Sequence, residues 1–121
     1  MTWSTYFVSV YTNEKTPPGE IEDLVAGMTK SVHSIFESEA NISAFTKGKA
    51  TSSNTEGHIR MVEGVVTCEL LIDLEGEGKC GLDKGKMSSL FKSAMGRSDL
   101  KFEKKCVEEV GKGSGESMFL T

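Results

Sequence analysis

Apolar residues recur with helical spacing in two stretches of this chain. Ile21–Phe36 carries apolar residues at offsets of 0, 3, 4, 7, 11, 14 and 15, which is the period of one face of a helix. A second stripe with the same spacing covers Met87–Met95. Asp83 precedes it as a candidate N-cap, and Gly96 follows where a helix commonly ends. The pattern therefore predicts two amphipathic helices.

Three longer stretches show the composition or the alternation of strands. Trp3–Thr12 is aromatic and β-branched with no charge, which favours a strand covered by neighbours on both sides. His58–Glu75 alternates apolar and polar residues, and its phase changes near Glu63–Gly64, where we expect a bulge or a turn. Asp99–Val110 also alternates, which predicts a further strand.

The remaining segments give weaker signals. Asn41–Ala50 is compatible with a short edge strand, and the polar residues 51–57 predict a loop. Gly76–Gly81 predicts a flexible connection into the second helix, and Met118–Leu120 predicts a short extra strand at the C-terminus.

The order of these elements predicts the fold class. A single α+β domain over residues 1–121 is expected, because this length is typical of one domain. Two helices with one apolar stripe each can cover one face of an antiparallel sheet. We therefore predict a ferredoxin-like (split βαβ) sandwich with both helices on one face.

Composition and charge narrow the class of protein. The formal net charge is −4, and 37% of residues are hydrophobic, which is typical of a small acidic globular protein. No apolar run is long enough to span a bilayer, and the N-terminus lacks the features of a signal peptide. We therefore predict a cytoplasmic or host-cell interior location, no secretion and no membrane partner.

The glycine-rich stretch is the best candidate for a cofactor site. Gly76–Gly81 fits the spacing G-x-G-x-x-G between a strand and a helix. The acidic residue that should end the next strand is absent, and Glu77 would repel a pyrophosphate. The three cysteines form no C-x-x-C pair. We therefore predict no cofactor and no metal.

Candidate chemistry rests on four residues. No catalytic set is evident, but His58, Tyr11 and Glu69 are the first candidates if the protein is an enzyme. Cys80 follows Lys79 just before the second helix, and both features lower a thiol pKa. Cys80 is therefore the candidate reactive thiol.

Two surfaces are candidates for contact with a partner. The sheet face without helices is predicted to carry an apolar interaction surface made of Trp3, Phe7, Tyr11, Val65 and Leu71. The last third of the chain is basic, and a candidate basic patch consists of Lys84, Lys86, Lys92, Arg97, Lys101 and Lys105. A nucleic-acid partner is not expected, because the strand that would stack bases offers acidic side chains instead of aromatic rings.

These observations favour a small, soluble, non-catalytic interaction module. It would act by self-association, with a homodimer expected, or by binding another macromolecule, as an accessory or inhibitory protein does. The alternative is a small dimeric α/β-barrel enzyme or ligand-binding protein with a pocket between paired sheets.

Overall fold

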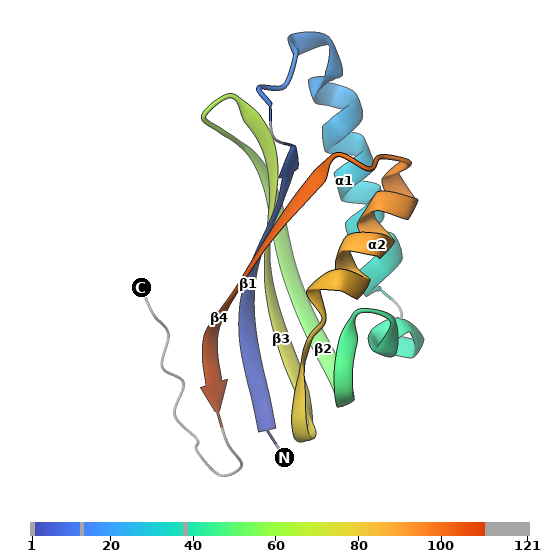
Figure 1. The fold of residues 1–121 in the computed structure, drawn as a ribbon, viewed down its shortest axis with the longest axis vertical. Coiled ribbons are helices and arrows are strands. Elements are labelled where there is room, and N and C mark those ends of the chain that lie inside the picture. Colours follow the sequence, from blue (N-terminus) through green and yellow to red (C-terminus); the bar gives the residue numbers. More distant parts are fainter. Residues whose placement is uncertain (1, 13, 38, 111–121) are drawn as a thin grey trace.

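A computed structural model describes residues 2–12, 14–37 and 39–110 of the chain (Figure 1). The predicted terminal strand Met118–Leu120 lies outside the described residues. The elements are β1 (Thr2–Thr12), a 3-10 turn (Pro18–Glu20), α1 (Ile21–Phe36), a second 3-10 turn (Glu39–Ala44), β2 (Thr46–Val62), β3 (Val65–Leu82), α2 (Lys84–Met95) and β4 (Leu100–Val110). The predicted order of helices and strands is confirmed over this range.

The four described strands form one antiparallel sheet in the order β2-β3-β1-β4. α1 and α2 pack on the same side of this sheet (Figure 1). The core lies between them, and its fully buried side chains include Met28 of α1, Phe91 of α2 and Leu70 of β3. We call the opposite side of the sheet the helix-free face.

The predicted ferredoxin-like (split βαβ) sandwich is wrong, because the sheet is strongly curled and forms a half-barrel (Figure 1). The cause lies in the strands. β2 and β3 have 17 and 18 residues, about three times the usual strand length, so the twist between strands accumulates. The register also shifts at two places in the β2–β3 pair and at one in the β1–β4 pair, and such bulges bend strands.

The long β2–β3 hairpin corrects two predictions about loops. Residues 51–57, predicted as a polar loop, lie inside β2, and the edge strand expected at Asn41–Ala50 begins only at Thr46. Gly76–Gly81, predicted as a flexible connection, lies inside β3. The polar segment of β2 forms a strand because each residue from Ser52 to Val62 pairs with β3, whatever its own propensity.

Glycine has a structural role at two positions of this hairpin. The bulge or turn expected near Glu63–Gly64 is a turn, and it divides the predicted strand His58–Glu75 between β2 and β3. Glu63 and Gly64 both have positive φ, 51° and 83°, as a two-residue type I′ turn requires. Farther along β3, a Cβ on Gly76 would stand 2.4 Å from the carbonyl oxygen of Lys49. Gly76 therefore permits a close approach of β2 and β3 that no other residue allows.

The helix predictions are confirmed. α1 spans Ile21–Phe36, as the spacing indicates. The Asp83 side chain accepts a hydrogen bond from the backbone N–H of Lys86 at 3.1 Å and so caps α2. Gly96 ends α2 in the left-handed conformation. None of the helices described here combines the length and apolarity needed to cross a membrane.

Candidate functional site

The helix-free face carries all five residues of the predicted interaction surface. Phe7 stands directly opposite Leu71 in the β1–β3 pair, and directly opposite residues share a face. Alternation along the strands places Trp3 and Tyr11 of β1 and Val65 of β3 on this face too. Phe7 is 38% exposed, whereas the next residue, Val8, faces the core and is 1% exposed. The other four are half-buried.

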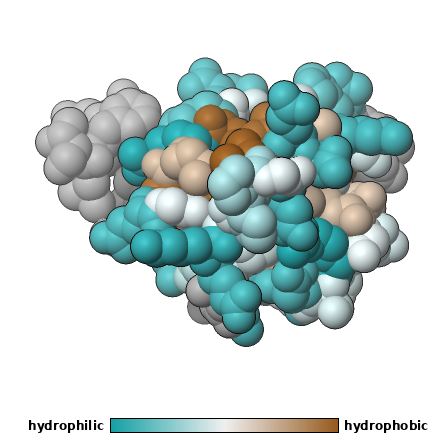
Figure 2. All heavy atoms as spheres, turned by 90° about the horizontal axis from the view of Figure 1, so that it is seen from above, coloured by the Kyte–Doolittle hydropathy of each residue, from teal (hydrophilic) through white to brown (hydrophobic). Residues whose placement is uncertain are grey.

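Large exposed hydrophobic side chains are few among the described residues: Phe7, Val25 and Met61. In the view from above, hydrophobic colour gathers in a small central patch enclosed by hydrophilic residues (Figure 2). Of these three side chains, Phe7 lies on the helix-free face, whereas Val25 belongs to α1 and Met61 pairs with the buried Val66 on the other side of the sheet.

Polar side chains around Phe7 already make hydrogen bonds within the chain. The Thr5 hydroxyl donates to Asp73 Oδ1 at 2.6 Å on one side of it. On the other side, the Tyr11 hydroxyl donates to Glu103 Oε1 at 2.6 Å. This bond stabilises the protonated phenol next to a carboxylate, so it raises the pKa of Tyr11.

Glu69 is a largely enclosed carboxylate of this face. Its side chain is 11% exposed, and it accepts hydrogen bonds from Nε of Arg60 and, at 3.2 Å, from Nη2. His58 Nε2 lies 3.2 Å from Glu69 Oε1. Hydrogen bonding to Arg60 is the main reason that the pKa of Glu69 is lowered.

The three candidate catalytic residues are brought together only in part. Tyr11 and Glu69 line one hollow of about 510 Å³ on the helix-free face, and His58 touches Glu69 from outside that hollow. The hydroxyl of Tyr11 is bonded to Glu103, and both oxygens of Glu69 are bonded to Arg60. The main interaction of the Glu69 carboxylate is therefore its pair of hydrogen bonds with the Arg60 guanidinium.

A second hollow of about 340 Å³ lies beside Trp3 on the same face. Two carboxylates, Asp73 and Glu75, line it together with the indole. An aromatic ring next to carboxylates attracts ammonium and guanidinium groups, because both the ring face and the charges are negative. The apolar centre at Phe7 is thus flanked by two hollows. The hollow beside Trp3 combines an aromatic ring with two carboxylates, and the hollow beside Tyr11 contains Glu63, Glu69 and Glu103 together with Lys15 and Arg60.

The predicted basic patch is divided between two surfaces. Lys101 lies in β4 opposite Tyr11, on the helix-free face. Arg97 donates two hydrogen bonds to Asp99, at 2.9 and 2.7 Å, so its charge is already paired within the chain. Three members belong to α2: Lys84, Lys86 and Lys92. The side chain of Lys105 lies outside the described residues.

The cysteines occupy two different environments. Cys80, expected in the flexible connection Gly76–Gly81, lies in β3 and is half-buried. Cys68 is 1% exposed, and burial raises the pKa of its thiol to about 12. The side chain of Cys106 lies outside the described residues. Within the described range, no group of three or more His, Cys, Asp or Glu side chains is placed to hold a metal ion.

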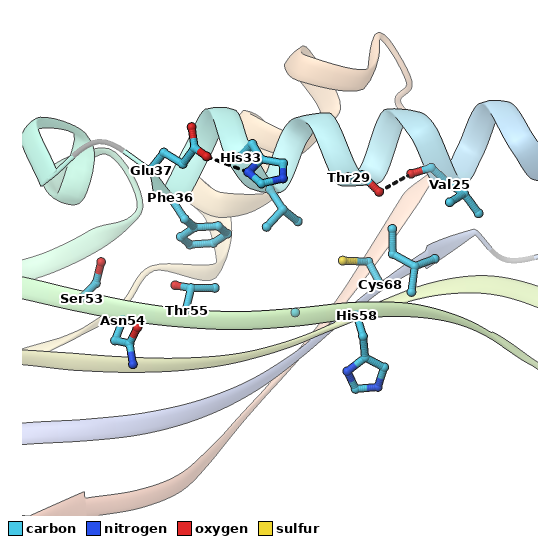
Figure 3. Close-up of a pocket in the computed structure, with 13 residues that line it drawn as sticks. Val25, Thr29, His33, Phe36, Glu37, Ser53, Asn54, Thr55, His58 and Cys68 are labelled. Carbon is cyan, nitrogen blue, oxygen red and sulfur yellow. Dashed lines mark hydrogen bonds and ion pairs between the residues drawn. The ribbon is translucent and has the colours of Figure 1, made fainter.

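Sequence reasoning missed a groove between α1 and β2, on the helix side of the sheet. Its volume is about 520 Å³. Figure 3 shows Ser53 and Thr55 of β2 and Cys68 of β3 pointing toward α1, whereas His58 and Asn54 point away. The one sequence feature that could have indicated the groove is the series of small residues at 51, 53, 55 and 57. These residues share one face only if the segment is a strand, and their small side chains then leave space beneath α1.

Comparisons with known proteins identify no family. No family model matches the sequence, and no curated protein matches it. Among solved structures, the chain is similar to an unknown protein from Galdieria sulphuraria, at 14% identity and a TM-score of 0.42, over 91% of this chain and 48% of that one. The chain therefore spans about half the length of that protein.

Two further solved structures share a coarse likeness. The de novo designed protein Foldit4 has 12% identity and a TM-score of 0.39, over 93% of this chain and 99% of that one. A tripeptidase from Staphylococcus aureus has 8% identity and a TM-score of 0.47, over 96% of this chain and 32% of that one. At these TM-scores, the likenesses identify neither a fold family nor a function.

Proposed function

We propose that the chain is a small, non-catalytic protein-interaction module whose helix-free face binds a protein segment with an apolar centre and basic flanks. The observation that carries this proposal is the position of Phe7. It is 38% exposed in the middle of β1, opposite Leu71, on the face that neither helix covers. Aromatic side chains in such central positions contribute most to binding in protein interfaces.

The surroundings of Phe7 favour burial against a partner. The bonds Thr5–Asp73 and Tyr11–Glu103 are made within the chain, so these groups keep a hydrogen bond when a partner removes water. Covering the face therefore costs less free energy than covering unpaired polar groups.

The charge of the face favours a basic partner over a second copy. The described charged side chains that the register places on it are Glu56, Glu69, Asp73, Glu75, Glu103, Arg60 and Lys101, so acidic groups predominate. Two copies placed face to face would bring like charges together, which is unfavourable. Lysine and arginine side chains of a partner could instead enter the hollows beside Trp3 and Tyr11.

A peptide titration tests this proposal. The probe is a short synthetic peptide with a central phenylalanine flanked by alternating valine and lysine, labelled for fluorescence anisotropy. We expect saturable binding that weakens as salt screens the charges, and no binding by a peptide with glutamate in place of lysine. Phe7→Ala should weaken binding about tenfold, which corresponds to loss of about 1.4 kcal/mol at a central contact.

Val25→Ala is the matched control, because Val25 is 36% exposed but lies on α1. It should leave peptide binding unchanged. Equal binding of both peptides, or no effect of Phe7→Ala, would contradict the proposal. A dimer in light scattering that Phe7→Ala dissociates would assign the face to a second copy instead.

A further inference from the structure

We infer that the groove between α1 and β2 is a binding site for a small neutral molecule with an apolar body and one hydrogen-bonding group. The groove lies on the helix side of the sheet, and the proposed protein contact uses the opposite face. The two proposals are therefore independent, and failure of one leaves the other unaffected.

The space and the walls fit a compact apolar body. The volume of about 520 Å³ lies within the usual range of small-molecule sites. Val25, Val32 and Phe36 form the wall on α1, and Ile59 lies across from them on β2. Val25 is 36% exposed, and the other three are only partly buried against the core. A ligand in the groove would remove this apolar surface from water.

The polar contact is provided by Thr55. Its Oγ1 is buried and has no hydrogen-bond partner among the described residues, which is rare for a buried hydroxyl. β2 pairs Thr55 with the fully buried Ile72, so its side chain is on the side of α1. Figure 3 shows it beneath Phe36, facing the groove. Because Oγ1 has almost no surface open to solvent in this rotamer, a rotation of the Thr55 side chain about χ1 must first turn the hydroxyl into the groove, where a hydrogen-bonding group of a ligand would satisfy it.

The charges of the groove favour a neutral ligand. His58 is among the residues that line the groove, but its side chain points away from α1 (Figure 3). The other histidine and the carboxylate of the lining, His33 and Glu37, lie 2.8 Å apart and are 63% and 71% exposed. Both therefore lie at the solvent rim. An ionised ligand group beside Thr55 would lose its hydration without gaining an opposite charge, and burial without such a partner is unfavourable.

Fluorescence of N-phenyl-1-naphthylamine provides the test. This probe is an apolar aromatic with one N–H donor, and its emission rises in an apolar site. We expect a saturable signal that Thr29→Trp abolishes, because Thr29 is an exposed α1 residue that lines the groove. Ser53→Trp fills the groove from β2 and should do the same. Lys30→Trp, an exposed neighbour outside the groove lining, is the matched control and should bind normally.

A second variant tests the role of the hydroxyl. Thr55→Val keeps the shape and removes the oxygen, so it should weaken the probe about threefold to tenfold without lowering the melting temperature. Competition by 1-phenylnaphthalene, which has no N–H, should be equal in wild type and Thr55→Val. The site would be overturned if wild type gave no saturable signal. It would also be overturned if Thr29→Trp and Ser53→Trp both fold and both bind the probe as strongly as Lys30→Trp does. An equal loss of both probes in Thr55→Val would overturn the hydrogen bond.

Discussion

The substitution Gly76→Ala tests the architecture of the long β2–β3 hairpin. It should be costly if Gly76 lies inside a strand in close contact with β2, and nearly neutral if Gly76 lies in a flexible loop. An added Cβ would stand 2.4 Å from the carbonyl oxygen of Lys49 and 2.8 Å from Sγ of Cys80. Real Cβ atoms essentially never come closer than 3.0 Å, so β2 and β3 must separate locally by about 0.6 Å. A backbone carbonyl cannot rotate away as the end of a side chain can, and the strands must move.

The expected cost follows from measured cases of overpacking. Such strain costs about 1–3 kcal/mol, and alanine returns about 0.4–1 kcal/mol by restricting the unfolded chain. We therefore expect Gly76→Ala to lower the free energy of unfolding by about 1–2 kcal/mol and the melting temperature by about 5–10 °C.

Thermal and urea unfolding followed by circular dichroism measure this change. Gly19→Ala is the matched control, because a Cβ at Gly19 meets nothing within 4 Å. It should change stability by no more than about 1 kcal/mol, and in the favourable direction. If both variants melt within about 1 °C of wild type, Gly76 does not lie in the close strand contact and the account of the hairpin fails.

Two further predictions concern titratable groups. In native protein, iodoacetamide followed by peptide mapping should modify Cys80 before Cys68, because Cys68 is 1% exposed and burial raises the pKa of its thiol to about 12. Modification of Cys68 before Cys80 would contradict this order. The lowered pKa of Glu69 means that its ionised form stabilises the fold above the ordinary pKa of 4.5, and that this contribution is lost as pH falls through the lower folded value. Glu69→Gln should therefore melt slightly below wild type at pH 7, by a small margin because Arg60 is largely exposed. The two melting temperatures should converge once the pH falls below the lowered pKa of Glu69, and a difference that persists in strong acid would refute the assignment to Arg60.

The helices and β1 were predictable because local signals and tertiary environment agree in them. Ile21–Phe36 carries its apolar stripe at helical spacing, and Asp83 and Gly96 are residues that cap a helix by their own chemistry. β1 is apolar on both faces, which indicates a central strand, and it lies between β3 and β4.

β2 was not predictable from its own residues. Its central part is polar, and its pairing depends on β3, which is distant from most of it in the chain. The curl of the sheet follows from the length of that hairpin and from its register shifts, so an error in residues 51–57 became an error in the fold class.

The two candidate sites differ in the same way. Phe7 and Leu71 could be assigned to one face from alternation, because both strands were predicted. Thr55 is not a candidate from the sequence, because the polar residues 51–57 predict a loop. The groove exists only because β2 runs alongside α1, a contact that no local pattern in the chain indicates.

The most direct test of the proposed function is a titration of ¹⁵N-labelled protein with the lysine-flanked peptide, followed in amide correlation spectra. The account predicts shift changes centred on Phe7 and Leu71 of the helix-free face, with amides around Met28 and Phe91 in the helices unchanged. It also predicts that Phe7→Ala removes these changes. Shifts centred on α1 and α2, or none at concentrations where other basic peptides bind acidic proteins, would contradict the proposed binding face.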